Sequence, residues 1–314
     1  MTKHHVPYEP TMSLQDTSLP HNPWLGLRKS NHFFENEEVS ALLRRALFYA
    51  RAGVPVHFRG NAGYGKTANA IEVARRLGSE VRIMTGNDWL GVEDIVGRQV
   101  GQTTSSVVDK YVQRVRRSET KLRYDWQDSV LADAMIHGHT LVYDEFTRAS
   151  PQANGMLLSV LEEGVLVNTD PLAVEESIHA HPNFRIVLTS NPDDYSGVNK
   201  TPDALLDRMM TFLLPRYSLE TESGVVAART GVDIVLSRRI VKLVREMSST
   251  KNRCSMRAAI MIAQISAMRL RSASLSDALL AQIAADVLNG RGVEVTTKQI
   301  AMYLNESKSE ECQT

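Results

Sequence analysis

One stretch decides the fold of this chain: Gly60-Asn61-Ala62-Gly63-Tyr64-Gly65-Lys66-Thr67. A phosphate chain binds where backbone N–H groups converge without side chains in the way and a helix begins, and the three glycines supply such a loop. The residues Val56 to Arg59 predict a strand before it, and those from Thr67 onward predict a helix. The stretch is therefore a complete Walker A loop in its expected setting, rather than an ordinary glycine turn.

The last residues of this loop have predictable roles. We expect Lys66 to reach the β- and γ-phosphates of ATP and the Thr67 hydroxyl to ligate Mg²⁺. The stretch from Gly60 to Ala68 then binds the nucleotide, with ATP and Mg²⁺ as cofactors. At average glycine usage, the full pattern arises by chance in about one chain in a hundred of this length.

An acidic element must accompany the loop, because the metal ion needs a carboxylate and the attacking water needs a proton acceptor. The run Thr140-Leu141-Val142-Tyr143-Asp144-Glu145 supplies both. We expect Asp144, at the strand end, to hold Mg²⁺ and Glu145 to be the catalytic base. Many strands end in acidic turns, but after a Walker A loop this run indicates a Walker B strand.

A third strand, Arg185 to Ser190, ends at Asn191-Pro192. A central strand would deliver the neutral amide of Asn191 beside the γ-phosphate, so Asn191 is a sensor candidate. The alternative is that Asn191 only begins a turn, a role for which asparagine is well suited.

Arginines complete many such sites from a neighbouring subunit, because a guanidinium at the γ-phosphate stabilises charge in the transition state. Arg208 is the first choice for this trans finger, and Arg148 and Arg216 are alternatives. Any of them can instead be a solvated surface residue or an ion-pair partner of Asp207. Arg257, further along the chain, is a candidate second sensor.

The pattern around these motifs alternates short apolar runs with helical stretches, which predicts an α/β fold with a parallel five-stranded sheet flanked by helices. The expected strands are Pro55–Arg59, Val81–Thr85, Thr140–Tyr143, Arg185–Thr189 and Thr211–Leu214. The expected helices are Glu38–Ala52, Thr67–Leu77, Trp126–His137, Pro151–Glu163 and Pro202–Met209.

Beyond Pro215 the strand signal disappears and amphipathic helices are predicted at Ile234–Met247, Met256–Leu270 and Leu275–Leu288. The domain organisation expected is an N-terminal arm (1–37), the α/β ATPase domain (38–215), a small all-helical lid domain (216–305) and a flexible tail (306–314). A unit of roughly 100 residues can hold its own core.

Composition indicates a folded, soluble, cytosolic protein. The 314 residues are 43% hydrophobic, and Lys+Arg 36 against Asp+Glu 36 creates no global field toward nucleic acid or membrane. No window approaches the roughly 18 apolar residues of a membrane helix. Cys254 and Cys312 lie far apart, with no Cys or His at metal-ligand spacing, which argues against a disulfide scaffold and a zinc site. His4-His5 is too short a run to predict metal binding.

The residues from Glu38 to Arg257 resemble the AAA+ ATPases of the MoxR type and, within them, the gas vesicle protein N family. The narrower resemblance lies in Thr140 to Arg148, Leu157 to Gly164 and Val107 to Tyr111. Gln152 and Gly155 replace an expected Glu and Asn, and Tyr64 is bulkier than usual; these departures concern fine specificity, not ATP use.

This resemblance implies a ring homo-oligomer, a hexamer, with ATP between subunits, and a role in assembling or enlarging gas vesicles. Shell or accessory proteins of the vesicle would be the partners, and the protein would be cytoplasmic or associated with vesicles. The resemblance also matches Gly86 to Gln102 to a loop inserted toward the ring pore. Its apolar residues Trp89, Leu90, Ile95 and Val96 would grip a client, or the stretch packs as a plain connection.

The segment from Lys110 to Asp125 carries six basic residues and two acidic ones. It has few interleaved aromatics and no nucleic-acid-binding motif, so a solvated face or a subunit interface is favoured over nucleic-acid binding.

Three functions fit the motifs. The first is an ATPase that drives gas vesicle assembly, and the second is a MoxR-type chaperone that activates a metalloenzyme or a carboxylase. The third is a scaffold that binds ATP with negligible hydrolysis, against which the presence of both Lys66 and Glu145 argues.

Overall fold

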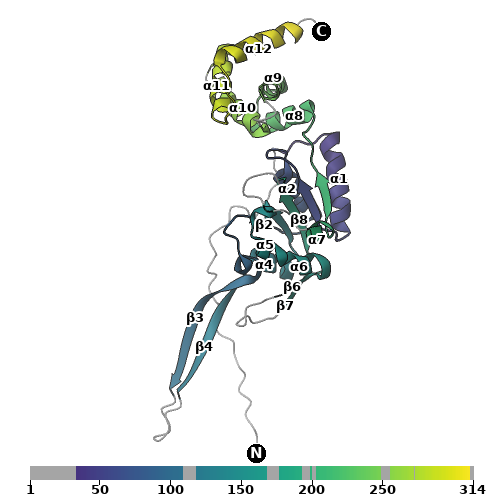
Figure 1. Cartoon of the computed structure of the whole chain (residues 1–314), viewed down its shortest axis with the longest axis vertical. Coiled ribbons are helices and arrows are strands. Elements are labelled where there is room, and N and C mark those ends of the chain that lie inside the picture. The colour runs from purple at the N-terminus through teal and green to yellow at the C-terminus, as the bar shows by residue number, and fades with distance from the viewer. Residues whose placement is uncertain are drawn as a thin grey trace, which may run out of the picture.

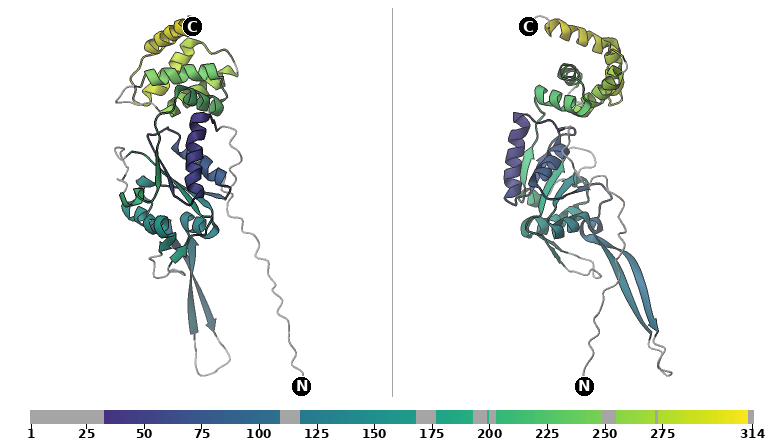
Figure 2. Two further views of the ribbon diagram at one scale, coloured as in Figure 1. Left: turned by 90° about the vertical axis from the view of Figure 1, so that its right-hand side faces the viewer. Right: turned by 180° about the vertical axis from the view of Figure 1, so that it is seen from behind.

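The computed structural model describes residues 33–108, 118–167, 177–192, 199, 203–248, 255–271 and 273–311 (Figure 1). An α/β region lies in the middle of the molecule, a helical region lies at one end, and a two-stranded hairpin projects from the other end (Figures 1 and 2).

The central element is a five-stranded, all-parallel sheet, as predicted. Its order is β2 (Val81–Thr85), β5 (Thr140–Asp144), β8 (Arg185–Ser190), β1 (Val56–Arg59) and β9 (Met210–Leu213). Each strand lies within one residue of its predicted bounds. Since β8 lies between β1 and β5, the three strands that carry the predicted motifs are direct neighbours, and their carboxyl ends share one edge of the sheet.

Both faces of the sheet are buried. Successive side chains of a strand point to opposite faces, and on each face they join an apolar cluster. Phe58, Val142 and Val187 join the apolar cluster on the side of α1 (Glu37–Arg51) and α2 (Lys66–Leu77). Their strand neighbours, among them Leu141, Tyr143 and Leu188, join a second cluster. That cluster also holds residues of α3 (Val92–Val96), α4 (Val130–His137), α5 (Pro151–Gly155) and α6 (Leu157–Glu163).

Three predicted helices differ from the structure. The expected helix from Trp126 begins only at Val130, because Trp126 pairs in a strand and Ser129 caps α4 through a bond from Ala132 N. The expected helix Pro151–Glu163 is divided into α5 and α6 at Met156, directly after Gly155, a residue that weakens helix interiors. α7 spans only Asp203–Leu206.

Two antiparallel hairpins were not predicted. β3 (Gly97–Val108) and β4 (Ser118–Asp128) pair from Gly97↔Asp128 to Val108↔Ser118 and extend away from the sheet (Figures 1 and 2). β6 (Val165–Val167) and β7 (Ser177–His179) form a shorter hairpin before β8. The pore-loop stretch Gly86–Gln102 therefore contains α3 and the start of β3.

The helical region consists of α8 (Leu219–Thr230), α9 (Ile234–Glu246), α10 (Met256–Leu270), α11 (Asp277–Asn289) and α12 (Thr297–Glu311). It has its own apolar cluster, which includes Ile240, Ile262, Leu280 and Ile300. α12 continues to Glu311, which lies within the segment expected to be a flexible tail (306–314); residues 312–314 lie outside the described part.

The end of the expected N-terminal arm is packed against the body. Asn36 caps α1 by accepting from Val39 N at 3.1 Å, and its amide donates to Thr221 Oγ1 at 2.7 Å. The Phe34 ring lies where a Cβ on Gly224 would be. Residues 33–36 therefore join α1 to α8, and the rest of the arm lies outside the described residues.

Candidate active site

The predicted phosphate-binding loop joins β1 to α2 with the backbone that its glycines allow. Gly63 and Gly65 have φ values of 82° and 79°, in the left-handed region that favours glycine. Gly65 is the N-cap of α2 and provides no side-chain cap. The first N–H groups of α2 therefore have no side-chain acceptor at this cap, as an anion-binding helix start requires.

Lys66 lies in the centre of the site. Its ammonium donates to Asn191 Oδ1 at 2.8 Å and to the Asn61 carbonyl at 2.9 Å, and the residue is buried. The pKa of Lys66 is lowered to about 8, mainly by burial; the Glu145 and Asp144 carboxylates oppose this shift, and the Arg257 charge adds to it. The predicted sensor and the loop lysine are thus in direct contact.

Thr67 and Asp144 also meet, as their predicted shared metal role requires. Thr67 Oγ1 donates to Asp144 Oδ1 at 2.7 Å, and Thr189 Oγ1 donates to the same oxygen at 2.5 Å. A hydroxyl and a carboxylate oxygen side by side are the hard oxygen ligands that Mg²⁺ prefers, so these residues fit the ion. Thr189, on β8, was not predicted; it also accepts from Glu145 N at 2.9 Å and so positions both acidic residues.

Glu145 has an unusual backbone. Its φ of 51° makes it the one non-glycine residue with positive φ in the described part of the chain, and a short 3-10 helix (Phe146–Arg148) follows it. Strain of this kind persists where the surroundings hold it, often at functional sites. The Glu145 carboxylate pairs with Arg148 Nε at 2.7 Å. Arg148, an alternative trans finger, therefore contacts the predicted base of its own chain.

A cavity of about 430 Å³ opens beside this cluster. Gly63, Lys66, Thr67, Glu145 and Asn191 line it. Ala62, Gly65, Ala68 and the predicted second sensor Arg257 also line it. Two other loop residues that were predicted to bind the nucleotide make contacts within the protein. Gly60 donates its N–H to Ser190 O at 3.3 Å, and Tyr64 packs on the apolar cluster beside α2.

Apolar side chains that were missed from sequence also line the cavity. They include Phe33, Phe34, Tyr217, Met256 and Ile260. Tyr217 is held by a 2.7 Å hydrogen bond from the Asn69 amide. These residues come from the end of the N-terminal segment, the connection after β9 and α10, and no local motif links them. A lining that combines polar groups for the phosphates with apolar side chains for a planar base fits a nucleotide.

The helical region lies directly against the loop. A Cβ placed on Gly63 would lie 2.5 Å from the Ser255 Cβ, at the start of α10. The nucleotide cavity is therefore formed jointly by the α/β region and α10, which accounts for the position of Arg257.

Arg208 and Arg216, the remaining finger candidates, do not line this cavity. Arg208 binds Glu162 Oε2 through Nε at 2.9 Å and through a terminal nitrogen at 2.6 Å. Its carboxylate partner is therefore Glu162, not the Asp207 considered from sequence. Arg216 pairs with the buried Glu222, which Arg245 also binds at 2.7 Å. Such a buried charge network gives Arg216 a structural role.

The expected client-gripping residues are mostly buried. Trp89 is 92% exposed, but Leu90, Ile95 and Val96 belong to the core beside the sheet. The prediction of an exposed apolar loop therefore holds for Trp89 alone among these four. The basic segment Lys110–Asp125 lies partly on β4, and its residues 110–117 lie outside the described part.

His57 connects three strands beneath the site. Its Nε2 lies 2.9 Å from Ser190 Oγ and its Nδ1 lies 3.0 Å from Thr211 Oγ1. Burial lowers the pKa of His57 to about 3, and the nearby Arg59 charge contributes to the shift, so the ring is neutral at pH 7. The contact with Ser190 supports the strand end that presents Asn191.

Comparisons with known proteins agree with this arrangement. Residues 55–209 match the family described as AAA domain (dynein-related subfamily). A protein named gas vesicle ATPase GvpN from Ancylobacter aquaticus is 40% identical over 267 residues, which cover 84% of this chain and 75% of that protein. The protein of the same name from Haloferax mediterranei is 40% identical over 234 residues, 74% of this chain and 67% of its own.

A more distant relative is Protein CbbQ from Hydrogenophilus thermoluteolus. It is 24% identical over 190 residues, which cover 60% of this chain and 64% of that protein. In addition, none of the helices in the described part of the chain has the length and apolar character that crossing a membrane requires.

Proposed function

The chain belongs to the gas vesicle ATPase GvpN family, and on this premise we propose that it couples ATP hydrolysis to the assembly or enlargement of gas vesicles. It is an ATP-hydrolysing enzyme of the AAA+ class, with MoxR-type relatives. The observation that carries the mechanism is a pair of contacts beside the cavity: Lys66 donates to Asn191, and Thr67 donates to Asp144.

The roles follow from these contacts. The N–H groups of the loop and the Lys66 ammonium bind the phosphates, and Asn191 orients Lys66 and senses the γ-phosphate. Thr67 and Asp144 would hold Mg²⁺, which neutralises phosphate charge when it is bound. The Phe33, Phe34 and Ile260 side chains enclose the base.

Glu145 accepts the proton of the attacking water. In the structure its carboxylate is paired with Arg148, so this ion pair must loosen for Glu145 to face a water at the γ-phosphate. Proton acceptance by a positioned carboxylate contributes about 10²- to 10⁴-fold in rate.

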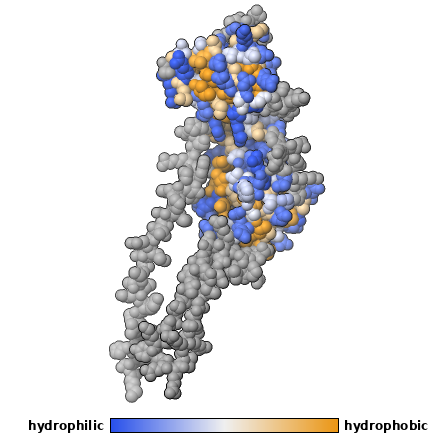
Figure 3. Space-filling view, turned by 60° about the vertical axis from the view of Figure 1, so that its left-hand side comes forward, coloured by the Kyte–Doolittle hydropathy of each residue, from blue (hydrophilic) through white to orange (hydrophobic). Residues whose placement is uncertain are grey.

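The transition-state arginine comes from a second copy of the chain. Arg208 lies outside its own cavity and its partner Glu162 is 55% exposed, so the pair is open to exchange for a phosphate. We propose a ring homo-oligomer, a hexamer, in which Arg208 of one subunit faces the ATP of the next. Apolar side chains reach the surface over the helical region (Figure 3). Met261, Ile265 and Met268 of α10 are exposed and would contribute to contacts between copies.

The partners in this proposal are shell or accessory proteins of the vesicle, met in the cytoplasm or at the vesicle surface. Deletion of the gene, followed by complementation, tests it by electron microscopy of vesicle number and size. Wild type should restore normal vesicles, whereas Lys66→Ala and Glu145→Gln should not. Restoration by Glu145→Gln would show that hydrolysis is not the driving step.

A second function, a chaperone for a metalloenzyme or a carboxylase, is supported by the similarity to CbbQ. The same deletion separates the two functions. Normal vesicles without the gene, together with a loss of activity in an enzyme encoded beside it, would favour the chaperone.

A further inference from the structure

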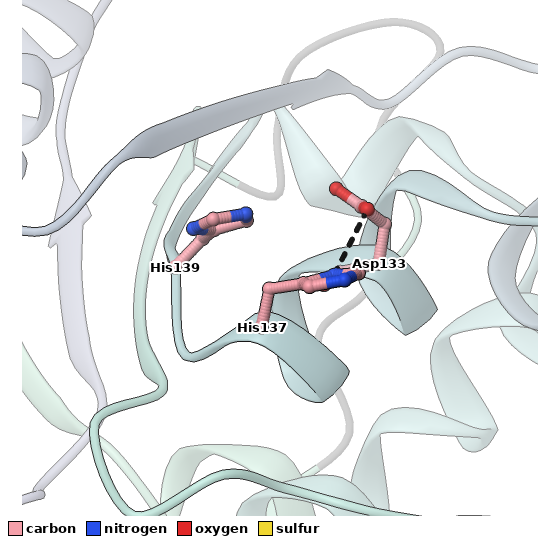
Figure 4. A group of neighbouring side chains, drawn as sticks. All are labelled: Asp133, His137 and His139. Atoms are coloured by element: carbon pink, nitrogen blue, oxygen red, sulfur yellow. Dashed lines mark hydrogen bonds and ion pairs between the residues drawn. The ribbon is translucent and has the colours of Figure 1, made fainter. Parts of the chain in front are cut away.

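A second cluster of ligand-type side chains lies at the opposite end of β5 from Asp144. α4 ends at His137, Gly138 turns the chain with a φ of 70°, and β5 begins at Thr140. Asp133 and His137 are four residues apart on one face of α4, and the turn brings His139 beside them (Figure 4). The pattern Asp133-x-x-x-His137-x-His139 thus gathers one carboxylate and two imidazoles.

The geometry of these three side chains suits a metal ion. One ligand atom from each lies within 4.8 Å of the others. The two imidazole rings lie side by side, with centroids 5.5 Å apart. Ligands about 2.0–2.2 Å from a tetrahedral Zn²⁺ are separated by roughly 3.3–3.6 Å, so the three side chains would rotate and move closer together to share one ion.

Neighbouring groups orient the ligands. His137 Nδ1 lies 3.0 Å from the Asp133 carbonyl oxygen, a contact that fixes the tautomer in which Nε2 is free to bind a metal. Arg82 Nε donates to Asp133 Oδ2 at 2.7 Å, which leaves Oδ1 turned toward His137. Contacts of this kind are typical of the shell around protein metal ligands.

The local charge also favours a cation. Glu80 Oε2 lies 3.7 Å from His139 Nε2, and Glu80 also pairs with Arg82. Asp133 and Glu80 against Arg82 leave one net negative charge when the imidazoles are neutral. His137 is 58% exposed, so an ion can enter from solvent, and Glu80 can turn inward as a fourth ligand.

We propose that Asp133, His137 and His139 form a binding site for one Zn²⁺ ion per chain. Two imidazoles and a carboxylate are ligands that Zn²⁺ accepts, with Glu80 or water in the fourth position. The site is separate from the predicted Mg²⁺ site, because the five residues of β5 place the two about 13 Å apart or more. A bound ion would tie the last turn of α4, the helix that follows the β3–β4 hairpin, to the start of β5.

The proposed site differs from the expectation from sequence that no zinc site is present. That expectation considered cysteines and histidine spacing alone, whereas this ligand set includes an aspartate one helical turn before a histidine. The inference does not depend on the proposed role in gas vesicles.

Isothermal titration of the full-length, untagged protein with ZnCl₂ tests the site. We expect one tight Zn²⁺ per chain, and at least tenfold weaker binding in both His137→Ala and His139→Ala. His179→Ala, an exposed histidine on β7 outside the cluster, and the double variant His4→Ala/His5→Ala should bind as wild type does. ATP titration of each variant checks that it is folded.

Cobalt substitution identifies the ligands independently. Co²⁺ in this site should show the visible bands of nitrogen and oxygen ligands without thiolate charge transfer, which excludes Cys254 and Cys312. The proposal is overturned if wild type binds no Zn²⁺, if folded His137→Ala and His139→Ala both bind it unchanged, or if thiolate bands appear.

Discussion

Two parts of the ATP site differ sharply: the residues around the phosphate-binding loop, here called the loop side, and the arginine candidates. The loop side is fully assembled within one chain, whereas Arg208, the first-choice arginine, lies outside the cavity. On the loop side, Lys66 and Asn191 are buried and joined by a hydrogen bond. Thr67 and Thr189 both donate hydrogen bonds to one carboxylate oxygen of Asp144. Arg208, in contrast, is paired with a partly exposed glutamate. The difference supports the proposal that one chain binds ATP by itself, while a second copy of the chain supplies the arginine that completes catalysis.

The largest expected effect is on ATP turnover in Arg208→Ala, a variant that leaves the loop side intact. Arg208→Ala should lower ATP turnover by about 10³-fold or more, because the guanidinium stabilises charge that develops only in the transition state. ATP affinity, measured by titration, should change little. Arg44→Ala, which removes an exposed arginine paired with Glu37, is the matched control and should retain full turnover. Equal loss in both variants would contradict a specific role for Arg208.

Glu145→Gln should lower turnover by about 10²- to 10⁴-fold while ATP still binds. The amide fits the same space but cannot accept the proton of the attacking water. Steady-state phosphate release and ATP titration measure the two properties. A variant that hydrolyses ATP at the wild-type rate would place the base elsewhere.

Lys66→Ala acts on the loop side and should weaken ATP binding by about 10- to 100-fold, because a charged hydrogen bond to phosphate is worth roughly 1.5–3 kcal/mol. Since the pKa of Lys66 is about 8, ATP affinity of the wild type should also fall as the pH rises through 8, where the ammonium loses its proton. Unchanged affinity in the alanine variant would refute the assignment of the loop.

The smallest expected effect concerns His57, which lies beneath the loop side, and the pH dependence of the unfolding free energy. The pKa of His57 is about 3 in the folded chain and about 6.5 when unfolded, so the unfolded state binds more protons between these values and stability falls as the pH falls. From pH 7 to pH 5, wild type should lose about 2 kcal/mol more unfolding free energy than His57→Asn. Urea unfolding at both pH values measures this; equal losses would mean that His57 is protonated in the native state.

Much of the loop side could be predicted from sequence, because each part depends on a local pattern. A glycine loop between strand and helix identifies Lys66 and Thr67, and an apolar run that ends in two acids identifies Asp144. The parallel sheet then brings these strand ends together. Thr189 was missed because a threonine inside an apolar strand has no distinctive spacing.

The remaining features depend on contacts between distant segments. Phe33 and Ile260 both line the cavity, although they lie far apart in the sequence. The β3–β4 hairpin is stabilised by pairing with itself, and its polar sequence lacks the apolar pattern of a core strand. The partner of Arg208 could not be predicted either, since Glu162 lies on α6, 46 residues earlier.

The central claim, that the site is completed by two chains, is tested most directly by mixing two inactive variants. Arg208→Ala retains an intact loop, and Lys66→Ala retains an intact arginine, so some interfaces in a mixed oligomer combine both. With subunit exchange verified by a fluorescent label, the mixture should recover measurable ATP turnover. Mixed oligomers that exchange subunits and stay inactive, while mixtures of Arg148→Ala with Lys66→Ala recover, would show that Arg148 acts in trans and that Arg208 does not.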